Sequence, residues 1–153
     1  MSQESQESKS SKSNTAEGTR TLVIERLFPH PPEKLWRALT ESPLLAQWMM
    51  NNDFEPIAGR RFQFRADPAP NWNGIIDCEV LVVDPLKQLS YSWGTLGLGS
   101  VVLFTLTPEE GGTHVRMEHS GFRPDQQQAY GGAKYGWQRF FDKLERVLGE
   151  GAP

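Results

Sequence analysis

Hydrophobic and polar residues alternate along five consecutive segments in the middle of the chain, from residue 59 to residue 119. Such alternation is typical of β-strands that have one apolar and one polar face. Turn-forming residues, such as Asp84 and Pro85 or residues 108–112, separate the segments. We therefore predict an antiparallel meander of strands with one face exposed to solvent. The residues expected on its apolar face are Phe62, Phe64, Ile76, Cys78, Val80, Val82, Leu89, Tyr91, Trp93, Val102, Phe104, Leu106, Val115, Met117 and His119.

Before the meander the pattern indicates one strand and two short helices. Residues 19–28 are rich in β-branched and apolar residues and predict a strand that ends at the prolines of residues 29–32. Those prolines suit the first turn of a helix. Ser42 is the expected N-cap of a second helix, with Pro43 at its first position and Trp48 on its apolar side.

The last segment has the period of a helix. Apolar residues recur there every three or four positions, which makes a stripe wide enough to cover a sheet, and Gly149 follows the last of them. The stripe consists of Ala133, Trp137, Phe140, Phe141, Leu144, Val147 and Leu148. The order of the elements is a strand, two helices, five or six strands and a long helix. This order predicts an α+β fold.

Composition divides the 153 residues into one domain and two tails. Residues 1–18 are rich in Ser, Glu, Gln and Lys, with only Met1 and Ala16 apolar, and predict a disordered tail. Residues 19–149 form the predicted domain, and residues 150–153 a C-terminal tail. We find no apolar core of a signal peptide and no run long enough to cross a bilayer.

The charge of the chain excludes two classes of partner. Its net charge is −3, of which the N-terminal tail contributes −1 through three Glu and two Lys. The domain therefore lacks the basic surface that nucleic acids or anionic membranes require. The single cysteine, Cys78, cannot form an internal disulfide, and a reducing cytoplasm is the expected location.

Several motifs, in a shared order, resemble those of one superfamily. Arg26-Leu27-Phe28, followed by Pro-Pro-Glu-Lys-Leu-Trp at residues 31–36, resembles the opening of the START-like (SRPBCC) superfamily. More narrowly it is similar to the bacterial group named after the activator of the ninety-kilodalton heat-shock chaperone's ATPase, which is related to polyketide cyclases. The match spans residues 20–148. Further matches are residues 44–48, residues 59–62, Asp84-Pro85, Leu89, Tyr91, Trp93, residues 119–122, Gly136-Trp137 and Leu144.

The resemblance implies a helix-grip fold, in which a curved antiparallel sheet wraps around a long C-terminal helix, with two short helices after the first strand. Members usually have a hydrophobic cavity between helix and sheet. Some bind lipids or aromatic natural products, some resemble polyketide cyclases, and a eukaryotic branch stimulates a chaperone ATPase. The chain departs from the common pattern at His30 and at Met49-Met50, both near the expected cavity mouth.

No motif indicates metal, cofactor or thiol chemistry. The three histidines are far apart in sequence, and His114 and His119 have opposite parity on one strand, so these two cannot share a metal. Cys78 has inward parity, where a small buried residue is the simplest interpretation. The glycine-rich residues 94–99 lie between two strands and precede no helix, which favours a hairpin loop over a phosphate site.

Two polar residues are candidates for contact with a ligand. His119 falls on the apolar parity of its strand, and a neutral imidazole can donate and accept a hydrogen bond. Alternatively, it is a buried histidine bonded to a neighbour. Arg26 shares parity with Phe28 and could hold a ligand carboxylate or phenolate. It could equally extend to solvent or pair with a carboxylate of the protein.

The many large aromatic residues leave two interpretations open. They can fill a core at crystal-like density or line a pocket for a hydrophobic ligand. Gly131, Gly132 and Gly136, costly near the start of a helix, favour an entrance to a cavity, with close backbone packing as the alternative. The predicted ligand-binding residues are Arg26, Trp48, Phe62, Phe64, Tyr91, Trp93, Phe104, Met117, His119, Tyr135, Trp137, Phe140 and Phe141.

Three functions follow as hypotheses. The first is the binding of a small aromatic or lipid-like molecule, with no catalytic residue, metal or cofactor. The second is a cyclase-like or hydrolytic enzyme that uses His119 or Arg26 on a polyketide-type substrate. The third is an interaction with a chaperone through the polar face of the sheet. The pattern leaves the oligomeric state open. The charged residues of that polar face are Arg61, Arg65, Asp77, Glu79, Arg116 and Glu118.

Overall fold

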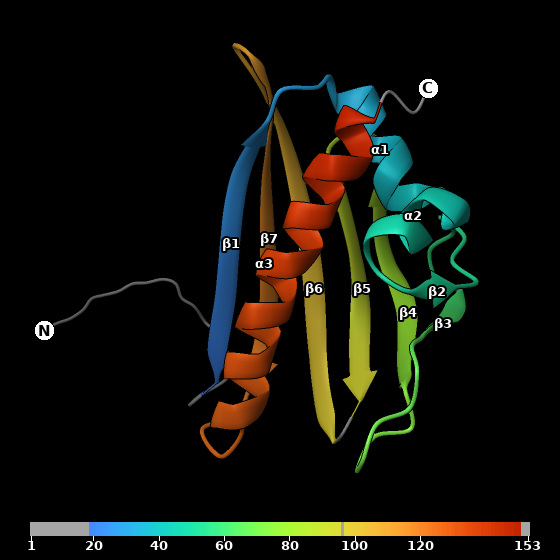
Figure 1. Cartoon of the computed structure of the whole chain (residues 1–153), viewed down its shortest axis with the longest axis vertical. Helices are drawn as coiled ribbons and strands as arrows, with labels where there is room; N and C mark the ends of the chain where they lie inside the picture. The colour runs from blue at the N-terminus through green and yellow to red at the C-terminus, as the bar shows by residue number, and fades with distance from the viewer. Residues whose placement is uncertain (1–18, 96, 151–153) are drawn as a thin grey trace, which may run out of the picture.

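The computed structural model describes residues 19–95 and 97–150, so the predicted N-terminal tail and residues 151–153 lie outside the described residues. A long helix lies across one face of a curved antiparallel sheet, and two short helices lie at one end of the same face (Figure 1). The elements are β1 (Arg20–Phe28), α1 (Pro32–Thr40), α2 (Ser42–Trp48), β2 (Asn51–Asn52), β3 (Arg61–Arg65), β4 (Ile75–Asp84), β5 (Gln88–Thr95), β6 (Leu98–Glu109), β7 (Gly112–Phe122) and α3 (Gln127–Gly149).

The described residues form a seven-stranded sheet with the order β1-β7-β6-β5-β4-β3-β2. Strands β2 to β7 are therefore a continuous meander, and β1 completes the sheet by pairing with β7. The predicted α+β helix-grip fold is confirmed, including the two short helices after the first strand. The glycine-rich segment is a tight hairpin in which Thr95 pairs with Leu98, and Gly97 supplies the positive φ of +75° that the turn requires.

Alternation along the strands places the expected side chains on the inner face, with one exception. Val82 was expected to face inward but is 40% exposed. A bulge between Val80 and Val82 adds one residue to β4 relative to β5, so that Val83 packs against the core instead. A bulge reverses the parity of every later residue, and alternation alone cannot locate it.

The short helix α2 begins one residue earlier than predicted. Ser42 is the first helical residue and Glu41 precedes it as the N-cap, without a side-chain capping bond. The Ser42 hydroxyl donates instead to the side-chain oxygen of Asn52, at 2.7 Å. The predicted cap is therefore wrong, because the serine connects α2 to β2 rather than satisfying its own helix.

The core is densely packed where α1 and α2 meet the C-terminal half of α3. Lys34 of α1 donates to the carbonyl of Leu148 at 2.7 Å and so satisfies one of the free carbonyls at the end of α3. The buried residues of α3 are Trp137, Phe141, Leu144, Val147 and Leu148. None of the five precedes Trp137, so residues 127–136 of the helix cover the sheet without filling the space beneath. Within residues 19–95 and 97–150, no helix is long and apolar enough to span a membrane.

Candidate ligand cavity

A cavity of about 650 Å³ lies between the first part of α3 and the sheet. Strands β4, β5, β6 and β7 form its floor, α3 forms its roof, and the segments after α2 and β3 close it at the side. Its walls are mostly apolar. The lining residues are Met49, Met50, Ala66, Trp72, Ile76, Trp93, Thr95, Leu98, His119, Gln128, Ala129, Gly132, Ala133, Gly136, Trp137, Phe140 and Lys143.

Small residues on α3 leave this space open. Ala129, Gly132, Ala133 and Gly136 follow one another at spacings of three, one and three residues, so they share one helix face. A Cβ atom added to Gly131, Gly132 or Gly136 meets no heavy atom within 4 Å. Close backbone packing therefore does not explain these glycines, and the first alternative, an opening beside the cavity, fits Gly132 and Gly136.

His119 on β7 belongs to a chain of hydrogen bonds beside the cavity. The indole Nε1 of Trp137 lies 3.1 Å from His119 Nδ1, and Ser100 Oγ lies 2.8 Å from His119 Nε2. The Ser100 hydroxyl in turn donates to the carbonyl of Trp93 at 2.8 Å. The chain thus connects the two tryptophans that form the cavity wall on the helix and on the sheet.

The donors in this series of hydrogen bonds determine the tautomer of His119. An indole N–H can only donate, so Nδ1 must accept and the imidazole proton is on Nε2, from which it is donated to Ser100. Burial lowers the pKa of His119 to about 4, so the ring is neutral at pH 7. His119 borders the cavity, but its side chain is fully buried and both of its nitrogens are engaged. The geometry fits a buried histidine bonded to its neighbours.

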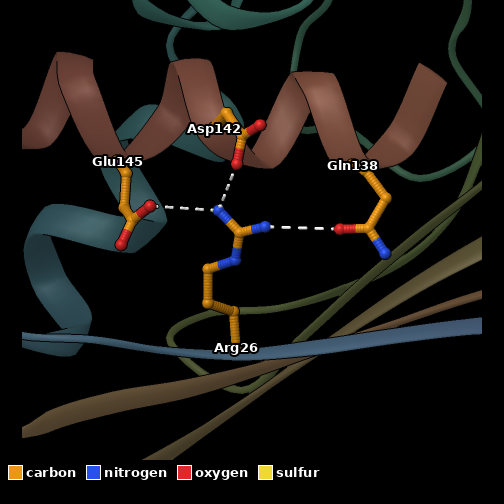
Figure 2. Close-up of polar contacts among 4 residues, drawn as sticks. All are labelled: Arg26, Gln138, Asp142 and Glu145. Carbon is orange, nitrogen blue, oxygen red and sulfur yellow. Dashed lines mark hydrogen bonds and ion pairs between the residues drawn. The ribbon is translucent and has the colours of Figure 1, made fainter. Parts of the chain in front are cut away.

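Arg26 does not reach the cavity but joins β1 to the side of α3 that faces it (Figure 2). Its Nη1 atom is 3.0 Å from Asp142 Oδ1 and 3.1 Å from Glu145 Oε1. Its Nη2 atom donates to Gln138 Oε1 at 3.4 Å. Of the alternatives for Arg26, the structure supports pairing with carboxylates of the protein, in a position where the guanidinium secures the helix to the sheet.

The predicted aromatic residues divide between the cavity and the packed core. Trp93, Trp137 and Phe140 line the cavity, together with His119. Tyr135 is 65% exposed and lies beside Arg139 on the outer surface of α3. The remaining predicted residues, all buried outside the cavity wall, are Trp48, Phe62, Phe64, Tyr91, Phe104, Met117 and Phe141.

Two aromatic residues of the packed core have a contact for their polar atom. Trp48 Nε1 donates to the carbonyl of Ala38 at 2.9 Å. The hydroxyl of Tyr91 lies 3.9 Å from Met49 Sδ, and burial raises the pKa of Tyr91 well above its usual value. Cys78 is also buried, and burial raises the pKa of its thiol, so it is an unreactive core residue. No three His, Cys, Asp or Glu side chains of the described ranges come together as metal ligands.

Trp72 is the main wall residue that the strand and helix patterns missed. It lies between β3 and β4 in a segment rich in proline and asparagine, which shows no periodicity. Its Nε1 atom donates to Thr95 Oγ1 at 2.8 Å, and Thr95 donates to the carbonyl of Ile75 at 3.0 Å. A large aromatic residue in an otherwise polar loop was the available signal that this loop covers an apolar surface.

With this geometry in place, comparisons with known proteins identify the family. Residues 29–149 match the family described as Activator of Hsp90 ATPase homolog 1-like protein. The chain belongs to this family. MLL2253 from Mesorhizobium loti, which has a crystal structure, is 56% identical to the chain in sequence. The match covers 88% of the chain and 100% of MLL2253, and the two structures superimpose with a TM-score of 0.82. No curated protein sequence matches the chain.

Two further solved structures share the fold of this AHSA1-like protein. DynU16, from the dynemicin biosynthetic locus, is 25% identical over 90% of the chain and 49% of DynU16, with a TM-score of 0.70. CalU16 from Micromonospora echinospora is 21% identical over 85% of the chain and 76% of CalU16, with a TM-score of 0.72, which shows the shared fold alone. The predicted START-like membership is confirmed.

Proposed function

We propose that this AHSA1-like protein binds a small hydrophobic molecule, aromatic or lipid-like, in the cavity between α3 and the sheet. The observation that carries the proposal is the cavity itself, about 650 Å³ in volume and roofed by glycine and alanine. Pockets of roughly 300–1,000 Å³ with mostly apolar walls are typical of sites for drug-sized ligands. A ligand that fills such a space removes apolar surface from water, which stabilises the complex by about 25 cal/mol per Å² of surface buried.

The hydrogen-bonded walls support this proposal, since a rigid pocket loses less entropy on binding. Trp93 and Trp137 are connected through His119, and Trp72 is held by Thr95. An enzymatic role for His119 has less support, because both of its nitrogens already have partners and its pKa is far below 7.

The chaperone hypothesis also has less support. On the polar face of the sheet, Glu25 pairs with His114 at 3.0 Å and with Arg116 at 3.1 Å. Arg116 also pairs with Glu118 at 3.1 Å. These side chains pair with one another on an exposed surface, which is the ordinary state of a solvated sheet face.

Replacing Gly136 by leucine tests the proposal. The new side chain points into open space beside the cavity, so it should occupy part of the ligand's volume without straining the helix. We expect affinity for the uncharged fluorescent probe N-phenyl-1-naphthylamine to fall at least about tenfold, the equivalent of about 1.4 kcal/mol. Fluorescence titration of the full chain measures it.

Gly131→Leu is the matched control. Gly131 lies on the same helix, also has open space around it, and is outside the cavity wall. This variant should bind the probe as the wild type does. Equal affinity of the Gly136 and Gly131 variants would contradict the proposal, as would a wild-type protein that does not bind the probe.

A further inference from the structure

Among the described residues that line the cavity, Lys143 is the one with a charged side chain. It is half-buried on α3 and contributes to the cavity wall. Throughout the described part of the chain, its ammonium group has no hydrogen-bond or ion-pair partner. An ammonium group at the edge of an apolar space must keep its water or find an anion, because burying an unpaired charge is costly.

The sequence of α3 explains why Lys143 has no partner on its own helix. Side chains three and four residues away are the neighbours on a helix surface. For Lys143 these neighbours are Arg139, Phe140, Arg146 and Val147, two of which are cations and two of which are apolar. The helix therefore offers no carboxylate at a spacing that pairs.

The nearest carboxylates along the helix are engaged elsewhere. Asp142 and Glu145 flank Lys143 in sequence, and both pair with Arg26 on the β1 side of α3 (Figure 2). These two carboxylates therefore lie on another side of the helix and leave Lys143 without a partner.

The other polar wall groups do not supply an anion. Thr95 and Trp72 bond to each other, and His119 is neutral with both nitrogens engaged. Gln128 contributes an uncharged amide. Among the lining residues that the structure describes, the cavity thus combines apolar walls with one positive charge and no carboxylate.

We propose that the ligand is a hydrophobic organic anion, whose apolar body fills the cavity and whose carboxylate or similar acidic group pairs with Lys143. The inference rests on the proposed binding function and specifies its ligand class. A charge-assisted hydrogen bond from an ammonium to a carboxylate is stronger than a neutral one. The flexible four-carbon stem of lysine lets the ammonium follow anions of different length.

A matched pair of probes tests this assignment on the full chain. 8-Anilinonaphthalene-1-sulfonate has the same aromatic body as N-phenyl-1-naphthylamine and adds one sulfonate. We expect Lys143→Met to lower the affinity for the sulfonate about tenfold relative to the affinity for the uncharged probe. Lys134→Met, the same substitution at an exposed position outside the cavity, should leave both affinities unchanged.

Two results would overturn the assignment. Equal sulfonate affinity in the Lys143 and Lys134 variants would show that the charge is not used, and an equal loss for both probes would indicate a structural role. Failure of the proposed function is recognised separately, because Gly136→Leu would then leave binding of the uncharged probe intact.

Competition distinguishes the two sources of such an anion. Displacement of the sulfonate probe by dodecanoate indicates a fatty acid, and displacement by 2-naphthoate indicates an aromatic acid. Each acid should compete better than its alcohol, dodecanol or 2-naphthalenemethanol. Alcohols that compete as well as the acids would contradict the proposal.

Discussion

Replacing Trp137 by alanine is expected to lower the free energy of unfolding by about 3–5 kcal/mol, the range typical of a deleted core tryptophan. Trp137 is only 1% exposed and packs against the rings of Trp93, Phe104 and Phe140. Its removal also leaves His119 Nδ1 without its donor in a buried site. Urea unfolding of the wild type and the variant at pH 7 measures the difference.

Tyr135→Ala is the control for this prediction. Tyr135 lies two residues earlier on the same helix but is 65% exposed. Its loss should change the free energy of unfolding by no more than about 0.5 kcal/mol. Similar values for the two variants would mean that α3 does not present Trp137 to the sheet as described.

Acid is expected to destabilise the protein through His119 between pH 6.5 and pH 4. Burial lowers the pKa of His119 from its usual 6.5 to about 4 in the folded protein. Between these values the unfolded chain binds more protons than the folded one, so stability falls as the pH falls. From pH 7 to pH 5 the loss amounts to about 2 kcal/mol, and it is complete only below pH 4.

His119→Gln isolates this contribution, because the amide can still accept and donate hydrogen bonds but does not titrate. Every other titratable group is common to the two proteins. The wild type should therefore lose about 2 kcal/mol more than the variant when urea unfolding at pH 7 is compared with that at pH 5. An equal loss in both proteins would show that His119 is protonated in the folded state at pH 5.

The fold was predictable because each element carries its own periodic signal. Alternation placed Tyr91, Trp93 and Met117 on the inner face of the sheet, and three- and four-residue spacing placed Phe141 and Leu144 on the inner face of the helix. Errors arose where local geometry breaks a period. The bulge after Val80 and the bond of Ser42 to Asn52 are examples.

The cavity was less predictable, because parity tells which face a side chain occupies but not what lies above it. Tyr91 and Trp93 are two residues apart on one face of β5, yet Tyr91 lies in the packed core and Trp93 lines the cavity. The difference depends on where α3 crosses the sheet. Tyr135 is two residues, or about 200°, from Trp137 around the helix, and therefore faces solvent. Lys143 lacked any motif to indicate its position.

Binding of a ligand in the cavity beside α3 should be visible in the indole N–H signals of the five tryptophans. Trp72, Trp93 and Trp137 line the cavity, whereas Trp36 and Trp48 do not. In a ¹H–¹⁵N NMR titration with N-phenyl-1-naphthylamine, we expect the first three signals to shift in a saturable way and the other two to stay in place. Saturable binding that leaves the signals of Trp72, Trp93 and Trp137 unmoved would contradict binding in this cavity.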